Sequence, residues 1–195
     1  MNTRTKEMKK LYAFILLFSM LSTHFPAKAE VLNHEENMPL LEKFGHNVGK
    51  TWQNGEYNLF IPINTWHNRL AYDQDKIDEY NEMPWGIGLG KARYDEDGAW
   101  HALYAMVFDD SNYHPQTIFG YAFQKNWFVN CNPDFRVGVG FTVSLTQRHE
   151  YLYIPVPLPL PLAGVEYKDW AVQAAYVPGV KNDGNVLFTW LRYRF

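Results

Sequence analysis

The 195-residue sequence contains one cysteine, no long apolar run beyond residue 29 and no excess of basic residues. The single cysteine, Cys131, excludes an intramolecular disulfide. Without an apolar run of about 20 residues, the chain beyond residue 29 offers no transmembrane helix. Residues 1–29 carry five of the 18 basic and one of the 21 acidic residues, which leaves a net charge of −7 for the remainder. This charge argues against a nucleic-acid partner, whose phosphates basic side chains would have to neutralise.

Residues 1–29 have the organisation of a secretory signal peptide. Four basic residues precede the apolar run Leu11–Leu21, and Ala27 and Ala29 follow it at the spacing of a cleavage site. The apolar run is too short to anchor the chain across a bilayer, and no cysteine stands at the cleavage site to carry a lipid. We therefore predict an exported chain that begins near residue 30 and is long enough for one domain.

Aromatic residues make up 17% of the chain, although its mean hydropathy of −0.36 is polar. A soluble domain accounts for the polarity but not for the aromatic residues. A transmembrane β-barrel accounts for both, because its strands alternate lipid-facing apolar residues with polar lumen residues and carry aromatic girdles. The segment FRVGVGFTVSLT (135–146) shows this alternation, with large apolar residues at odd positions and mostly small or polar ones at even positions.

Eight segments with strand-like patterns follow one another along the chain. They cover about residues 57–72, 85–94, 99–108, 116–128, 134–146, 151–166, 170–178 and 185–195. Residues 36–50 instead repeat apolar residues every four positions and predict a short amphipathic helix; a mobile N-terminal segment is the alternative. The sequence thus predicts an all-β protein, with a helix-containing segment (30–56) before an eight-stranded antiparallel transmembrane β-barrel (57–195).

The expected connections alternate in length, with short ones at 95–98, 130–133 and 167–169 and longer ones at 73–84, 109–115 and 179–184. Because such barrels have short periplasmic turns and longer outer loops, the end of the first strand and the loop 109–115 are expected at one outer mouth. His67, Asp110 and Ser111 would meet there, and an imidazole, a carboxylate and a hydroxyl together suit acyl transfer. Taken alone, Asp-Asp-Ser is also an ordinary turn sequence.

Prolines interrupt several of the expected strands. Pro62 falls in the first strand, four prolines between 155 and 161 fall in the sixth, and Pro178 ends the seventh. Because proline has no N–H to donate, each leaves adjoining backbone unpaired. Such gaps would admit lipid sideways, which gives Pro62 and Pro178 a role in gating; the alternative is that these prolines only mark strand ends or bulges.

Several stretches resemble the PagP family of outer-membrane lipid A palmitoyltransferases. They are YNLFIPINTWHNRLAYD, YNEMPWGIGLG, DEDGAWHALYAMVFDDS, GYAF, YIPVPLPLPLAG and YVPGVKNDGNV, spread over almost the whole chain from Thr51 onward. The resemblance implies transfer of an acyl chain from the sn-1 position of a phospholipid to the hydroxyl of the N-linked hydroxyacyl chain on the proximal sugar of lipid A.

The resemblance also implies that His67, Asp110 and Ser111 are catalytic. We expect His67 to remove a proton from the attacking hydroxyl and Asp110 to orient His67 or stabilise its charged form. Ser111 is either a covalent nucleophile or a positioning hydroxyl, and Asp109 is a neighbour that adds negative charge.

Small residues on the lumen faces would make room for the acyl chain: Gly86, Gly88, Gly90, Gly120 and Ala122. The resemblance implies that the position of Ala122, a glycine in the family, forms the floor of a pocket for a sixteen-carbon chain. Because alanine adds a methyl group there, we expect the transferred chain to be palmitate or slightly shorter.

Two further residues are expected to contribute to lipid recognition. Asp95 matches an acidic residue that the family links to lipopolysaccharide recognition. Lys181 replaces an aromatic residue in the last outer loop, where it would either meet a lipid phosphate or remain a solvated lysine.

The resemblance implies a phospholipid donor, a lipid A acceptor and a place among the lipids of the bacterial outer membrane. The sequence is compatible with a monomer or a homodimer. Neither a cofactor nor a metal ion is expected. A non-enzymatic structural or adhesion barrel with eight strands is the alternative. A soluble lipid-binding barrel is disfavoured, because its exterior would carry the aromatic and aliphatic residues that lie opposite the small ones.

Overall fold

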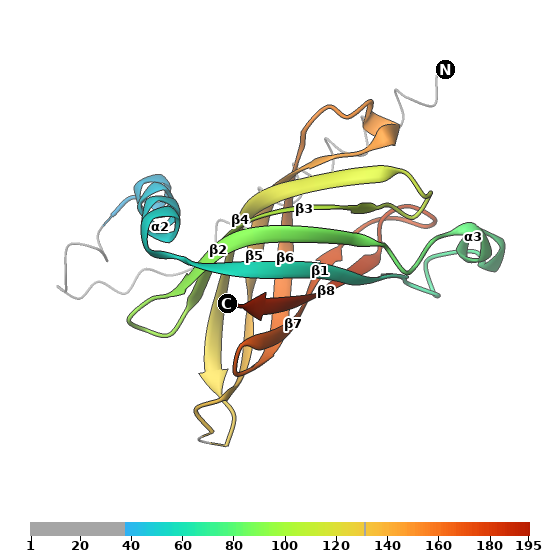
Figure 1. The fold of residues 1–195 in the computed structure, drawn as a ribbon. Coiled ribbons are helices and arrows are strands. Elements are labelled where there is room, and N and C mark those ends of the chain that lie inside the picture. Colours follow the sequence, from blue (N-terminus) through green and yellow to red (C-terminus); the bar gives the residue numbers. More distant parts are fainter. Residues whose placement is uncertain (1–37, 131) are drawn as a thin grey trace. The chain divides into compact units, whose positions relative to one another are not determined.

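Eight antiparallel strands form a closed barrel in which consecutive strands pair and β8 closes against β1 (Figure 1). The computed structural model describes residues 38–130 and 132–195. The expected signal peptide (1–29), residues 30–37 and Cys131 lie outside the described residues. The elements are α2 (Leu40–Asn54), β1 (Glu56–His67), α3 (Gln74–Glu79), β2 (Gly86–Tyr94), β3 (Trp100–Asp109), β4 (Pro115–Phe128), β5 (Phe135–Gln147), η2 (His149–Tyr151), β6 (Val156–Tyr167), β7 (Trp170–Val177) and β8 (Val186–Arg194). The expected eight-stranded barrel with a preceding helix is confirmed.

Alternation along the strands gives the barrel an apolar outer surface. On β5, the side chains of Thr142 and Ser144 are buried inside the barrel. Val139, which alternates with the inward-facing residues of this strand, is 55% exposed on the outside. Exposed apolar residues on the strands include Ile87, Leu89, Val107, Phe119, Val139, Phe141, Val143, Val165 and Val172. A surface of this composition is typical of a lipid-facing barrel wall. In the part of the chain that the structure describes, no helix is long and apolar enough to cross a bilayer.

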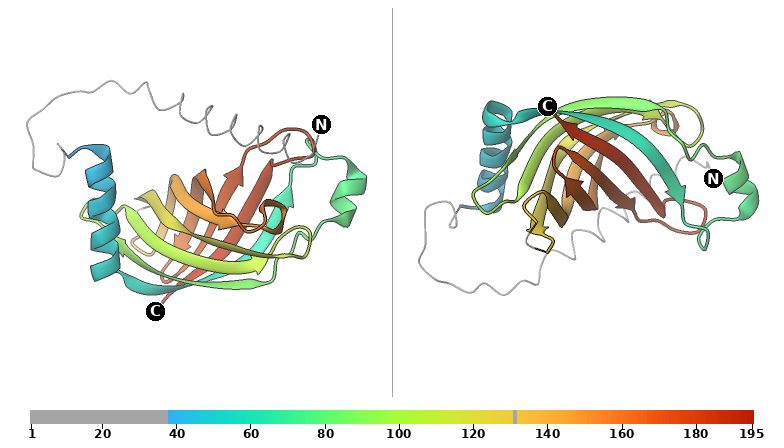
Figure 2. Two further views of the ribbon diagram at one scale, coloured as in Figure 1. Left: turned by 90° about the horizontal axis from the view of Figure 1, so that it is seen from above. Right: turned by 60° about the horizontal axis from the view of Figure 1, so that its bottom comes forward.

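The two ends of the barrel carry different connections. Short turns at 95–99, 129–134 and 168–169 lie at the end where α2 packs. The connections 68–85, 110–114, 148–155 and 178–185 lie at the other end; all of them except 110–114 are longer than these turns, and the first contains α3. We call these the α2 end and the α3 end; Figures 1 and 2 show the two helices at opposite ends of the barrel.

The lumen is apolar toward the α3 end and polar toward the α2 end. Its apolar part includes Phe60, Met106, Phe108, Ile118, Leu160 and Phe188. Next to it, Trp190 Nε1 donates to Gln173 Oε1 over 3.2 Å, and Gln173 Nε2 donates to Gln124 Oε1 over 3.1 Å. Nearer the α2 end, buried Arg192 pairs with Glu166. These buried polar groups pair with one another, although Arg192 Nε has no hydrogen-bond partner, and together they bound the apolar part.

Helix α2 contacts the barrel at the α2 end through a small number of side chains. The Phe44 ring meets the Tyr121 ring edge-on at a centroid distance of 5.0 Å, and Arg93 Nη2 donates to Asn47 Oδ1 over 2.6 Å. Leu40 nevertheless remains 87% exposed. The helix therefore presents apolar side chains outward, as an interfacial membrane helix does.

The first strand is shorter than expected. It ends at His67 rather than at residue 72, because Asn68 begins a tight turn. The Asn68 backbone oxygen accepts hydrogen bonds from Ala71 N and Tyr72 N, and its side-chain Oδ1 accepts one from Leu70 N. The helix α3 that follows was not expected, and α2 covers residues 40–54 rather than 36–50.

The sixth strand begins at Val156 rather than at residue 151. Leu152 and Tyr153 have φ angles of 54° and 57°, which an extended strand cannot contain. The short helix η2 precedes them. The connection at 148–155 is therefore longer than expected.

Candidate active site

His67 and Ser111 form a hydrogen bond at the α3 end. Ser111 Oγ lies 3.1 Å from His67 Nε2, although the two residues are 44 positions apart. His67 is the last residue of β1, and Ser111 is the second residue of the connection 110–114 that follows β3. Their exposed fractions are only 2% and 9%. A buried imidazole next to a hydroxyl is the arrangement needed to remove the proton of that hydroxyl.

The other ring nitrogen of His67 faces a carboxylate. His67 Nδ1 lies 3.0 Å from Glu82 Oε1, and the same oxygen accepts a hydrogen bond from the His67 backbone N–H over 3.0 Å. A carboxylate at Nδ1 favours the tautomer with hydrogen on Nδ1, so that Nε2 carries the lone pair. The lone pair then faces the Ser111 hydroxyl.

Glu82 is itself held by Arg69 and by β1. Arg69 Nη1 donates to Glu82 Oε1 over 2.6 Å, and Arg69 Nη2 donates to Oε2 over 2.5 Å. The backbone oxygen of Glu82 accepts from Thr65 N and from Asn64 Nδ2. The Arg69 hydrogen bonds, more than those from His67, lower the pKa of the Glu82 carboxyl to about 2. Glu82 is therefore negatively charged near neutral pH.

Two tyrosine rings enclose the His67 imidazole. Tyr80 stacks on it at a centroid distance of 4.6 Å, and Tyr72 meets it edge-on at 5.0 Å. Tyr72 OH donates to the Gly184 backbone oxygen over 2.7 Å, and burial raises the pKa of this phenol. These rings limit rotation of the imidazole and shield it from water.

Asp110 shapes the loop that carries Ser111. Its Oδ1 accepts hydrogen bonds from the backbone N–H groups of Asn112 and His114, over 2.8 and 2.9 Å. Its Oδ2 lies 3.9 Å from Arg148 Nη2. Among the described residues Asp110 makes no hydrogen bond with His67; the carboxylate at the imidazole is Glu82. The structure thus brings Ser111 to His67 and places Asp110 behind the Ser111 loop.

The expected pocket residues lie on the lumen side. Gly88 and Gly90 allow large side chains to lie against the wall: a Cβ at Gly88 would come within 2.2 Å of Met106 Cγ, and one at Gly90 within 2.9 Å of Phe60 Cε2. Gly86 and Gly120 are likewise close to neighbouring backbone, at Phe108 and Ser144. The room left by the glycines is therefore shared with large apolar side chains.

Ala122 lies at the boundary between the apolar and polar parts of the lumen. It is 1% exposed and belongs to the apolar cluster. Two positions further along β4, Gln124 belongs to the polar network with Gln173. An apolar chain inserted from the α3 end would meet polar side chains just beyond Ala122.

The barrel wall has two places where pairing stops short of the α3 end. β1 pairs with β2 only over Glu56–Phe60, just before Pro62, and a bulge follows Pro62 in the pairing with β8. β6 pairs with β7 only over Leu162–Tyr167. At the second place a groove of about 470 Å³ is lined by Val139, Gly140, Phe141, Pro161, Leu162, Ala163, Ala174, Tyr176 and Leu187. Pro178 follows the end of β7, as expected.

Asp95 and Lys181 lie at opposite ends of the barrel. In the turn at the α2 end, Asp95 Oδ2 lies 3.0 Å from His101 Nε2, and Asp95 Oδ1 accepts from Ala99 N. Lys181 Nζ lies 2.9 Å from Asp73 Oδ1 near the surface of the α3 end. Lys181 is thus paired within the protein, and neither residue contacts His67 or Ser111.

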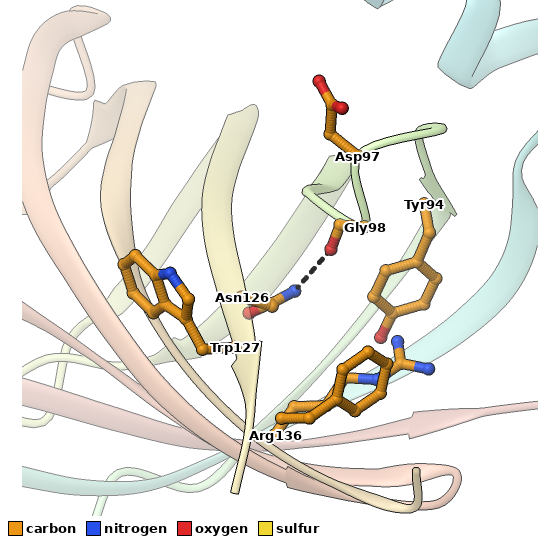
Figure 3. A pocket seen from close by; sticks show the side chains of 7 residues that line it. Tyr94, Asp97, Gly98, Asn126, Trp127 and Arg136 are labelled. Atoms are coloured by element: carbon orange, nitrogen blue, oxygen red, sulfur yellow. Dashed lines mark hydrogen bonds between the residues drawn. The ribbon is translucent and has the colours of Figure 1, made fainter. Parts of the chain in front are cut away.

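A second hollow, of about 180 Å³, lies at the α2 end (Figure 3). It is lined by Tyr94, Asp97, Gly98, Asn126, Trp127, Phe128 and Arg136. Asn126 Nδ2 donates to the Gly98 backbone oxygen over 3.4 Å, and the Arg136 guanidinium lies 4.6 Å from the Tyr94 ring centre. No histidine lies among these residues, so this hollow has no general base of the kind found at the α3 end.

The sequence patterns missed Glu82 and Arg69. Both lie in the connection 68–85, whose conformation determines their contact with His67. Periodicity carries no information about such a loop.

Over the residues described, no cluster of three or more histidine, cysteine or acidic side chains is arranged to hold a metal ion.

Comparison with known proteins shows the family to which the chain belongs. The family model described as "Antimicrobial peptide resistance and lipid A acylation protein PagP" matches residues 47–192. A lipid A acyltransferase PagP from Proteus mirabilis is 52% identical over 89% of this chain and 83% of its own length. One from Serratia proteamaculans is 49% identical over 92% of this chain and 93% of its own. The chain therefore belongs to the PagP family, and its eight strands form the transmembrane barrel of that family.

Proposed function

We propose that this protein transfers an acyl chain from the sn-1 position of a phospholipid to lipid A in the bacterial outer membrane. The acceptor is the hydroxyl of the N-linked hydroxyacyl chain on the proximal sugar. The observation that carries the proposal is the hydrogen bond between Ser111 Oγ and His67 Nε2, with a carboxylate at Nδ1. The names of the relatives, which are lipid A acyltransferases, support the acceptor.

His67 acts as the general base in this reaction. Its Nε2 removes a proton from the attacking hydroxyl, the new ester bond forms on the acceptor, and the ester bond of the donor breaks. His67 then returns the proton to the leaving lysophospholipid, so that no proton is gained or lost overall. Ser111 is the hydroxyl that contacts Nε2 in this structure, and Asp110 fixes the loop that presents it.

The wall openings are suited to admit lipid from the membrane. The groove beside β6 and β7 opens where the hydrogen-bonded pairing of these two strands ends, and apolar residues line most of it. A lipid entering there would insert its tail into the apolar part of the lumen and leave its headgroup near the α3 end. We assign the α3 end to the outer surface, because outer-membrane barrels carry their longer connections there.

The proposal is tested with purified, folded protein in detergent with lipid A and phospholipid labelled on either the sn-1 or the sn-2 chain. We expect label in lipid A only from the sn-1-labelled donor, together with release of lysophospholipid. Equal transfer from both positions would contradict the assigned donor position. Absence of transfer from either would favour the non-enzymatic barrel.

Replacement of Ala122 by glycine (A122G) should lengthen the preferred acyl chain by about one methylene. Ala122 borders the polar network of Gln124, so removal of its methyl group extends the apolar space toward the α2 end. One buried methylene contributes about 0.8 kcal/mol, which is about a fourfold preference at 25 °C. Mass spectrometry of the product from a mixture of donors measures this. Strict selection of palmitate that does not change in A122G would contradict the assignment of Ala122 as the floor.

A further inference from the structure

We infer that Glu82, clamped by Arg69, is the positioning residue that holds the His67 imidazole in its working tautomer and orientation. This inference rests on the proposed function, because it assigns Glu82 a part in the same reaction. Glu82 touches the nitrogen of His67 that lies opposite the Ser111 hydroxyl. It therefore acts on the reacting atoms only through His67.

The backbone of Glu82 is fixed to the strand that carries His67. Its carbonyl oxygen accepts from Thr65 N over 2.9 Å and from Asn64 Nδ2 over 3.0 Å. The side chain then reaches both the N–H and the Nδ1 of His67. Movement of the carboxylate away from the imidazole would require breaking several hydrogen bonds at once. Such redundancy is what holds a catalytic group within the narrow range of productive geometry.

The segment 80–82 also contacts Ser111, the residue that carries the hydroxyl of the site. Tyr80 stacks on the imidazole, and Asn81 N donates to the Ser111 backbone oxygen over 2.9 Å. Three consecutive residues therefore touch the base and the residue that carries the hydroxyl. The connection 68–85 thus aligns the two groups relative to each other.

The charges around His67 assign Glu82 to orientation rather than to proton uptake. Among the described residues, Arg69 and Arg148 are the cationic groups that act on the imidazole, and Glu82 is the anionic one. Because the pKa of Glu82 is about 2, its carboxylate does not accept the proton from His67. Its negative charge offsets the two guanidinium groups and stabilises the imidazolium that forms during transfer.

Asp110 does not orient the imidazole of His67. Its Oδ1 accepts from two backbone N–H groups of its own loop, and Arg148 Nη2 lies 3.9 Å from its Oδ2. The two carboxylates of the site thus have separate tasks. Asp110 shapes the loop of the hydroxyl, and Glu82 orients the base.

The test is the substitution Glu82→Gln, which keeps the shape of the side chain and removes its charge. The glutamine amide can turn its NH₂ toward Nδ1 and so favour the tautomer with hydrogen on Nε2, which cannot take a proton from the attacking hydroxyl. We expect kcat to fall by about 10²-fold with little change in KM, since loss of base catalysis of this kind costs roughly 10²–10⁴-fold. The matched control is Asp78→Asn, which removes a charge near Arg69 that does not contact His67. This control should retain the wild-type rate.

A second measurement does not depend on the variant being folded. ¹⁵N NMR of the wild-type protein in micelles should show His67 with hydrogen on Nδ1 and a lone pair on Nε2. The opposite tautomer in the wild type, or an E82Q variant with wild-type kcat, would overturn the inference. If the wild type and E82Q transfer alike, the proposed function stands and only the role of Glu82 fails. If the wild type transfers nothing, the proposed function fails, and the NMR result still decides whether Glu82 orients His67.

Discussion

Replacement of His67 by glutamine (H67Q) should lower the rate of acyl transfer by about 10²- to 10⁴-fold, the contribution usual for a general base. Glutamine can still hydrogen-bond to Ser111 and Glu82, but it has no nitrogen that accepts a proton near neutral pH. His67 is buried between Tyr72 and Tyr80 at the end of β1, so no water molecule in bulk solvent can easily replace it. The loss should therefore appear in kcat.

Purified H67Q is compared with His149→Gln in the lipid A transfer assay. His149 lies at the same end of the barrel, is exposed, and stacks on His114 at 4.2 Å without contacting His67 or Ser111. The His149 variant should keep the wild-type rate. Electrophoresis with and without heating shows whether each variant forms a folded barrel. A folded H67Q with wild-type kcat would mean that His67 is not the base.

The barrel could be predicted from sequence because side chains along each strand point alternately outward and inward, so the apolar pattern repeats every two residues. The segment 135–146 alternates without interruption, and β5 places Val139 outward and Thr142 inward as that pattern requires. Strand ends were less predictable. The residues after His67 continue in a strand-like pattern, yet the hydrogen bonds of Asn68 turn the chain. Hydrogen bonds between a side chain and nearby backbone groups compete with strand pairing. They do not change the pattern of apolar residues, so the pattern does not show where the strand ends.

From the order of strands and loops alone, His67 and Ser111 could be placed at the same end of the barrel. His67 ends β1 and Ser111 lies two residues beyond the end of β3, and since these strands run in the same direction, both residues lie at the same mouth. Their contact at 3.1 Å agrees with this prediction. The chemical task of each carboxylate could not be deduced in this way. Asp110 is adjacent to Ser111 in sequence, whereas Glu82 reaches His67 only because the connection 68–85 folds back over β1.

Replacement of Ser111 by alanine (S111A) should remove acyl transfer to lipid A. Ser111 Oγ is the hydroxyl at Nε2 of His67, and alanine leaves that position without a polar group. Ser111 is 9% exposed and follows β3, so the change removes one oxygen without altering the loop that Asp110 holds. The loss should be similar in size to that of H67Q, because residues that act as a unit lose about the same activity when either is removed.

The most direct measurement of the central claim is mass spectrometry of lipid A from a Gram-negative host that lacks an enzyme of this family. Cells that produce the wild-type chain should contain lipid A with one additional acyl chain, and cells that produce S111A should not. Immunoblotting of outer-membrane fractions confirms that both proteins are present in equal amount. Additional acylation by S111A at the wild-type level would contradict the assignment of the Ser111–His67 pair as the acyl-transfer site.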